Sequence, residues 1–222
     1  RDDDPPAVVS HILNDIGEVD KLKSVDLSQN KRVQTWLEAT RILLERTNNS
    51  LFIICRADQG AFFFWLPCLE EVKTFLLDLA IGEQKDKIYK LLDYCNDVHI
   101  QFAKLVKAVG AHATTCGDAY CGPGLISPAM YEEYVLPYHK QAVYQIKEKL
   151  GLPYSIHICG FTDPIHDLWI QSGATFFEVD HMTDIVSLRK KTKEISLFGN
   201  LNTSSLCFES PEVVKRCCMD LF

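Results

Sequence analysis

A histidine and a cysteine two residues apart are the part of the sequence best suited to metal chemistry. His157 and Cys159 stand in the stretch YSIHICG, and Gly160 follows them. Side chains alternate along a strand, so in an extended segment the imidazole and the thiol point to one side while Ile156 and Ile158 point to the other. Imidazole and thiolate are preferred zinc ligands, and a catalytic zinc keeps one position open. The spacing predicts a zinc site at His157 and Cys159; the alternative is a buried histidine beside an inert cysteine.

Three acidic residues follow or end apolar segments and are candidates for acid or base chemistry. Asp118 comes after AHATTC, Glu178 lies in TFFEV, and Asp180 follows it. Glu178 and Asp180 share one strand face and could form a pair in which one carboxyl has a raised pKa. We predict catalytic roles for all three. The alternatives are that Asp180 binds loop amides and that Asp118 only terminates its strand.

Three further polar residues are predicted to bind substrate. Arg56 and Asp58 follow the apolar stretch LFIIC, and Asn200 follows ISLFG. A guanidinium binds a carboxylate through two parallel hydrogen bonds, which makes Arg56 the anion-binding candidate. A surface arginine after a strand is the alternative.

The segments that position these residues alternate between strand and helix patterns. Short apolar runs predict strands over residues 51–55, 111–116, 154–159, 175–179 and 195–199. Helical spacing and Ser-Pro or Asp-Pro starts predict helices over 30–47, 83–109, 127–150 with a kink at Pro137, 163–172, 183–193, and from 210 onward. Strands separated by helices indicate a parallel sheet with crossover helices.

The parallel sheet could be an open doubly wound sheet or a barrel. No glycine-rich phosphate loop follows any predicted strand, which argues against a nucleotide-binding sheet. We therefore predict an α/β fold, a (β/α)8 TIM barrel that is incomplete here, because a whole barrel needs about 250 residues. Residues 1–28 form an N-terminal lead and 29–222 the partial barrel of about five units. Such folds gather function at the carboxyl ends of the strands, where the candidate residues lie.

The composition and charge of the chain exclude some classes of binding partner. The 222 residues are 47% hydrophobic and 24% charged, which is typical of a folded chain. A net charge of −7 provides no positive field for nucleic acid, and no apolar run reaches the length of a membrane span. The nine cysteines are an odd number and dispersed, so we expect free thiols in the cytoplasm.

Three stretches are similar to a known family. They are GLISPAMYEEYVLPYHKQ, YSIHICGFTDPIHDLWIQSGATFFEVD and FGNLNTSSLCFESPEVV. Together they resemble the uroporphyrinogen decarboxylase superfamily over residues 30–222. The H-x-C-G element resembles its zinc-dependent branch, the methylcobamide:coenzyme M methyltransferases and related corrinoid-dependent enzymes. The resemblance implies a barrel longer than this chain.

The resemblance also implies a reaction. His157 and Cys159 would be two of three zinc ligands, the third being a cysteine beyond Phe222, with Cys207 as the alternative. Zinc would activate a small acceptor thiol, whose thiolate takes the methyl group from a methylcorrinoid, free or on a partner protein. The stretch ADQGAFFF departs from the family because the proline of its turn is missing.

Two other functions stay open. A uroporphyrinogen decarboxylase needs no cofactor and stabilises a protonated pyrrole with a carboxylate such as Asp118 or Asp180. A partial barrel that binds a tetrapyrrole without turnover is the non-enzymatic alternative, and its exposed strand edges favour homo-oligomers. Stoichiometric zinc separates the methyltransferase from both.

Overall fold

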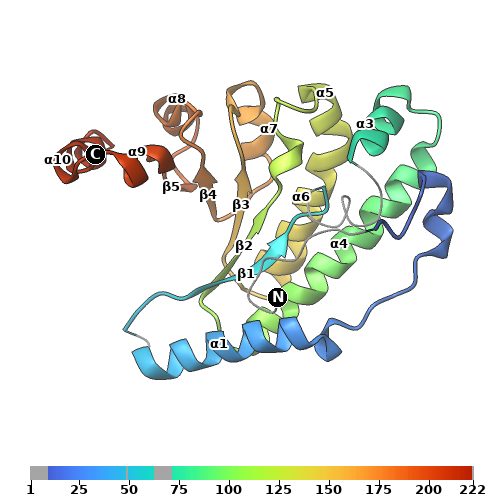
Figure 1. Cartoon of the computed structure of the whole chain (residues 1–222), viewed down its shortest axis with the longest axis horizontal. Helices are drawn as coiled ribbons and strands as arrows, with labels where there is room; N and C mark the ends of the chain where they lie inside the picture. The colour runs from blue at the N-terminus through green and yellow to red at the C-terminus, as the bar shows by residue number, and fades with distance from the viewer. Residues whose placement is uncertain (1–9, 49, 63–71, 222) are drawn as a thin grey trace.

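The sheet is wholly parallel, and its strands follow one another in chain order (Figure 1). In a computed structural model, which describes residues 10–48, 50–62 and 72–221, the strands are β1 (Ile54–Gln59), β2 (Ala113–Gly117), β3 (Tyr154–Ile158), β4 (Phe176–Val179) and β5 (Ser196–Phe198). Each pairs with the next in parallel register. A doubly wound sheet reverses its strand order, whereas a barrel adds each strand beside the last. The fold is therefore a partial (β/α) barrel.

Helices connect the strands as predicted. The α-helices are α1 (Lys31–Thr47), α3 (Val72–Ile81), α4 (Lys85–Ala108), α5 (Pro128–Met130), α6 (Leu136–Val143), α7 (His166–Ile170), α8 (Ile185–Lys191), α9 (Thr203–Phe208) and α10 (Pro211–Met219). The 3-10 segments are η1 (Ile16–Lys21), η2 (Leu27–Gln29), η3 (Ala119–Cys121) and η6 (Asp163–Ile165), and the π-helical segments are η4 (Tyr131–Val135) and η5 (Tyr144–Lys149). Ser127 and Ser210 cap helices whose first residue is proline.

The hydrophobic core lies on the helix-covered side of the sheet. Ile156, Ile158 and Phe177 point to that side and are fully buried, as are Leu91 and Leu92 on α4. Residues that alternate with them on the strands face the other way; they include the polar Ser155, His157 and Glu178 and the apolar Phe176. In a complete barrel this second side is the interior, so we call it the inner face of the sheet.

The described part of the N-terminal lead packs against α4. Ile16 and Val19 on η1 are buried in the core. Asp20 forms ion pairs with Lys87 and Lys90 of α4, which lower its pKa to about 2. The described lead, residues 10–29, is thus held against α4 by apolar packing and by these ion pairs.

The structure differs from the predicted elements in three places. β1 begins at Ile54 rather than at residue 51, and α3 and α9 lie where no helix was predicted. The predicted kink at Pro137 coincides with a π-helical turn, η4, immediately before α6. Proline offers no N–H to the preceding turn, and π turns occur where the helix ladder is interrupted. None of the described helices is both long and apolar enough to span a bilayer.

Candidate metal and substrate site

His157 and Cys159 lie together at the carboxyl end of β3. His157 Nε2 is 3.1 Å from Cys159 Sγ, and His157 Nδ1 is 2.9 Å from the main-chain oxygen of Glu178 on β4. A carbonyl only accepts, so Nδ1 carries the proton and the Nε2 lone pair faces the thiol. The hydrogen bond with Cys159 raises the pKa of His157, while partial burial opposes the rise. This tautomer is the one that ligates a metal through Nε2.

The pair fits two positions of a zinc ion. Typical zinc–nitrogen and zinc–sulfur bonds at a tetrahedral angle place the two ligand atoms about 3.5 Å apart, so small shifts would accommodate the metal. Cys159 is exposed and His157 half-buried, which leaves room on the solvent side. Within the described residues, no third histidine, cysteine or carboxylate joins these two atoms in a ligand group.

The loop after β2 supports the end of β3 from the neighbouring strand. The amide of Asp118 donates to the main-chain oxygen of His157 at 2.8 Å. Gly122 packs against Cys159 so closely that a Cβ there would lie 3.0 Å from the Cys159 oxygen. Beside Cys159 is a hollow of 360 Å³, lined also by Phe161 and Met182. The pair therefore sits on a supported backbone beside an open, largely apolar recess.

The Asp118 side chain lies away from the inner face. It is fully buried, and its Oδ2 is 3.1 Å from His139 Nε2 on α6, while the Tyr131 hydroxyl is 2.9 Å from His139 Nδ1. Burial raises the pKa of Asp118, although the hydrogen bond with His139 opposes the rise. The Cys121 thiol donates to the Asp118 carbonyl. Asp118, Cys121 and His139 form a ligand-type group of side chains, but it is sealed from solvent.

Glu178 and Asp180 have different partners and do not form a pair. Glu178 Oε1 accepts from the Thr115 hydroxyl on β2. Asp180 Oδ1 accepts from the amide of Met182 at 2.9 Å and lies 3.0 Å from His181 Nδ1. Burial raises the pKa of Asp180, but the amides and nearby histidines outweigh it, and the pKa lies below its usual range. Glu178 thus faces the inner side of the sheet, whereas Asp180 orders the loop after β4.

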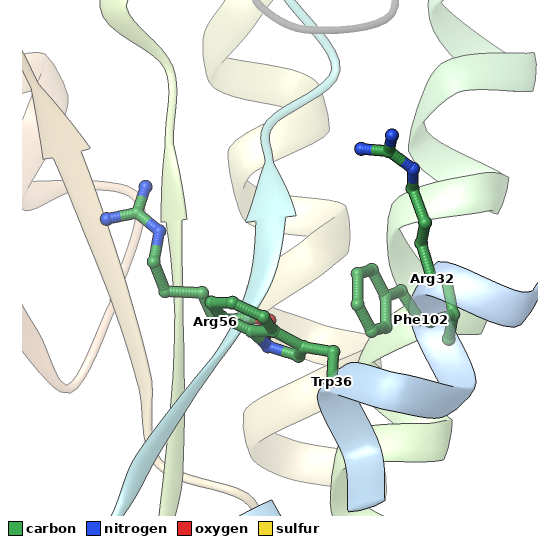
Figure 2. Close-up of a pocket in the computed structure, with 5 residues that line it drawn as sticks. Arg32, Trp36, Arg56 and Phe102 are labelled. Carbon is green, nitrogen blue, oxygen red and sulfur yellow. The ribbon is translucent and has the colours of Figure 1, made fainter. Parts of the chain in front are cut away.

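The residues predicted to bind substrate lie in different parts of the structure. Arg56 lies on β1 with its side chain on the inner face, and Figure 2 shows the guanidinium directed toward the neighbouring strand. Asn200 donates to the main-chain oxygens of Asp180 and Thr183 and so holds the loop after β4. Asp58 lies on β1, but its side chain falls outside the described part of the chain.

Sequence reasoning missed the partners that support these residues. Thr115 and His139 are such partners, each buried and each bonded to a predicted site carboxylate. The signal for Thr115 was its place two residues before Gly117 on a strand, which puts both on the inner face. His139 carried no signal, because helical position alone does not show which strand end a side chain reaches.

Comparison with known proteins identifies the family. The model of the uroporphyrinogen decarboxylase (URO-D) family matches residues 1–221. The chain belongs to this family. A solved methyltransferase from Methanosarcina mazei superposes with a TM-score of 0.78 at 21% sequence identity, over 88% of this chain and 56% of that one. At that identity the likeness confirms the fold, including the barrel to which the five strands belong.

Among curated members of the URO-D family, the two MtbA methyltransferases match more of this chain than the uroporphyrinogen decarboxylases do. Methylcobamide:CoM methyltransferase MtbA of Methanosarcina acetivorans is 29% identical over 94% of this chain and 60% of its own length. A methylated-thiol–coenzyme M methyltransferase of M. mazei is 27% identical over 54% of the chain and 32% of its own length. A Synechococcus uroporphyrinogen decarboxylase is 26% identical over 60% of the chain and 36% of its own length. The chain thus spans about three fifths of the length of the MtbA enzymes.

Proposed function

We propose that this chain carries part of the active site of a corrinoid-dependent methyltransferase, with His157 and Cys159 as zinc ligands. The substrates are a methylcorrinoid, free or protein-bound, and a small thiol. The relatives named for methylcobamide and coenzyme M support this reading, since they match more of the chain than the decarboxylases do. A reducing cytoplasm suits an enzyme that depends on a thiolate ligand.

The observation that carries the proposal is the geometry of His157. Its Nδ1 proton is held by a main-chain oxygen, and its Nε2 faces Cys159 Sγ at 3.1 Å. A buried structural histidine needs no thiol at its second nitrogen, and an inert cysteine is not usually exposed at the end of a strand. Both features are expected of metal ligands with a hydrogen-bonded outer partner.

The chemistry divides between the metal and the chain. Zinc, when bound, lowers the pKa of a thiol at its open position and so supplies a thiolate at neutral pH. The thiolate sulfur attacks the methyl carbon; a sulfur–carbon bond forms, the cobalt–carbon bond breaks, and its electron pair stays on cobalt. The chain orients the imidazole through Glu178 and offers the recess lined by Phe161 and Met182 beside the reacting groups.

Zinc content tests the proposal. Elemental analysis of the purified wild type should give about one zinc per chain, and Cys159→Ser should lose most of it because a hydroxyl is a poor zinc ligand. Cys207→Ser is the matched control, since Cys207 is also exposed but lies on α9. Methyl transfer from methylcobalamin to simple thiols should follow the zinc content.

Two results would overturn the proposal. One is a wild type without zinc after purification in its presence; the other is equal zinc in the Cys159 variant and the control. If loss of carboxyl groups from uroporphyrinogen accompanied either result, the decarboxylase alternative would replace it.

A further inference from the structure

His139 is a buried histidine whose side chain reaches from the helix layer to the end of β2. It lies on α6 and is 3% exposed, and both of its ring nitrogens have partners. Nε2 is 3.1 Å from Asp118 Oδ2, and Nδ1 is 2.9 Å from the Tyr131 hydroxyl on η4. Among the described side chains, His139 is the one that bonds the Asp118 carboxyl. The orientation of that carboxyl therefore depends on the imidazole.

Asp118 connects His139 to the strand that carries the proposed zinc ligands. Its main-chain amide donates to the main-chain oxygen of His157 at 2.8 Å, and its own carbonyl accepts from the Cys121 amide at 3.2 Å. The carbonyl of His157 belongs to the first of the two peptide groups that separate His157 from Cys159. The hydrogen bond from Asp118 therefore holds the chain between the two ligands.

Gly60 leaves the Asp118 carboxyl little room to move. A Cβ at Gly60 would lie 2.7 Å from Asp118 Cγ, closer than real Cβ atoms approach other atoms, and the Gly60 amide donates to the Gly117 oxygen at 2.9 Å. The carboxyl thus lies between the backbone that follows β1 and the imidazole on α6. Because the side chain cannot swing freely, we expect a change at His139 to displace the Asp118 main chain as well.

A catalytic metal site is sensitive to such displacements. Functional side chains need to stay within about 0.5 Å of their working geometry, and partners behind the ligands hold them there. One such partner is the Glu178 carbonyl, which accepts from His157 Nδ1. That bond orients the imidazole, whereas the bond from Asp118 holds the main chain on the β2 side.

We propose that His139 is a positioning residue of the metal site, which acts through Asp118 to hold the His157 main chain where His157 and Cys159 can share one ion. The inference rests on the proposed function. It gives His139 no contact with metal or substrate. A histidine that served only the stability of the core would loosen the whole sheet when removed, whereas this role predicts a change confined to the carboxyl end of β2.

Amide hydrogen exchange tests the connection itself, on the full chain labelled with nitrogen-15 and kept free of metal with EDTA. The two amides compared lie at opposite ends of β2: that of Asp118, which donates to His157, and that of Thr114, which donates to the Pro153 oxygen at 2.9 Å. His139→Leu should raise the exchange rate at Asp118 about tenfold, as expected for the loss of a hydrogen bond to a charged group, and change Thr114 by less than about twofold. His139→Gln should restore the wild-type rate, because a side-chain amide both donates and accepts.

His166→Leu is the matched control. His166 is also buried, at 1% exposure on α7, but the carboxyl beside it is that of Asp163, 3.5 Å away. Its substitution should not raise exchange at Asp118 above that at Thr114. If far-ultraviolet circular dichroism shows that His139→Leu does not fold, Gly60→Ala replaces it, since the added methyl group displaces the Asp118 carboxyl and leaves the imidazole present.

Cobalt(II) reports on the metal ligands without an assay of activity. A thiolate bound to cobalt(II) gives a charge-transfer absorption band, and the band that is lost in Cys159→Ser belongs to the proposed site. His139→Leu should weaken the cobalt affinity measured by this band about tenfold, the usual effect of removing a supporting partner. The affinities of His139→Gln and His166→Leu should stay near that of the wild type.

The outcomes separate this inference from the proposed function. An unchanged Asp118 amide in His139→Leu, equal increases at Asp118 and Thr114, or no recovery in His139→Gln would overturn the role of His139. Equal cobalt affinity in the wild type and His139→Leu would overturn it too. No cobalt band in the wild type, with the exchange pattern as expected, would remove the proposed function and leave only the connection between His139 and the His157 main chain.

Discussion

The orientation of His157 depends on a main-chain atom of its neighbour. The partner of Nδ1 is the carbonyl of Glu178, while the Glu178 carboxylate turns to Thr115. The hydrogen bond that orients His157 therefore does not depend on which side chain stands at position 178. A substitution of Glu178 can therefore remove the carboxylate that bonds Thr115 and keep the carbonyl that bonds His157.

We predict that Glu178→Gln keeps its zinc, because the main-chain oxygen that holds His157 is retained. His157→Ala, by contrast, should lose it together with the imidazole. Elemental analysis of the two purified variants checks the prediction. A Glu178→Gln protein without zinc would show that the carboxylate, not the carbonyl, supports the site.

A buried histidine on α4 should make stability depend on pH. His99 is 1% exposed, its Nδ1 bonds the Ala57 carbonyl at 3.1 Å, and burial lowers its pKa to about 4. The unfolded chain binds a proton near pH 6.5, so stability is complete above that pH and falls as pH drops toward 4, by at most about 3 kcal/mol. Urea unfolding at pH 7 and pH 5 measures the slope. His99→Gln should flatten it; an identical slope in wild type and variant would contradict the assignment.

At the scale of elements, the end of β5 lies close against the backbone at the end of β4. Gly199 has φ +120, and a Cβ there would lie 2.4 Å from the main-chain oxygen of Val179. Gly151, which follows η5, has φ +60 with no atom within 4 Å of its Cβ position. Both glycines have a positive φ, but only Gly199 has other atoms close to its Cβ position.

We predict unequal costs at these two glycines. Gly199→Ala adds a backbone clash to the strain and should lower the free energy of unfolding by roughly 3 kcal/mol. Gly151→Ala carries only the left-handed strain, about 1 kcal/mol. Thermal unfolding of both variants under the same conditions gives the comparison. Equal losses would mean that the β4–β5 junction relaxes to accept a side chain.

The alternation of elements was predictable from sequence, but the position of β1 was not. The apolar run at 51–55 suggested the strand, yet Leu51 and Phe52 are largely exposed and the strand is Ile54–Gln59. Every second side chain of β1 faces the inner side of the sheet, and the polar Arg56 on that side interrupted the apolar pattern. The helix α9 was missed because six residues hold too few turns for a period.

The candidate site was predictable where one strand carries it. Alternation along β3 was enough to place His157 and Cys159 on one side. The alternation along a strand could not place Asp118, which follows β2. Its side chain points to the helix layer, where it is hydrogen-bonded to His139 on α6. Contacts between a strand end and a distant helix depend on packing angles that no local pattern records.

The whole molecule has two strand edges that no described strand covers, those of β1 and β5. Trp36 caps one main-chain oxygen of β1, whereas Phe198 on β5 is 49% exposed. Unpaired edges with apolar side chains favour pairing with other chains. The β5 edge, with an apolar side chain beside it, is therefore open to pairing with another strand.

We predict concentration-dependent self-association of this chain through the β5 edge. Phe198→Lys should weaken it, because a charged side chain at an edge opposes pairing. Phe208→Lys is the control, since Phe208 is 83% exposed but lies on α9. Sedimentation velocity over a hundredfold concentration range measures the effect. A monomer throughout, or equal effects of the two substitutions, would contradict it.

The hydrogen bond that His157 Nδ1 donates to the Glu178 carbonyl also affects when the site can form during synthesis. The amide of Asp118 and the carbonyl of Glu178 fix the pair from both neighbouring strands, and both precede residue 180. A nascent chain thus has the main-chain hydrogen-bond partners of His157 once β4 leaves the ribosome. The earliest moment for metal capture is set by the emergence of β4, while later residues are still being translated.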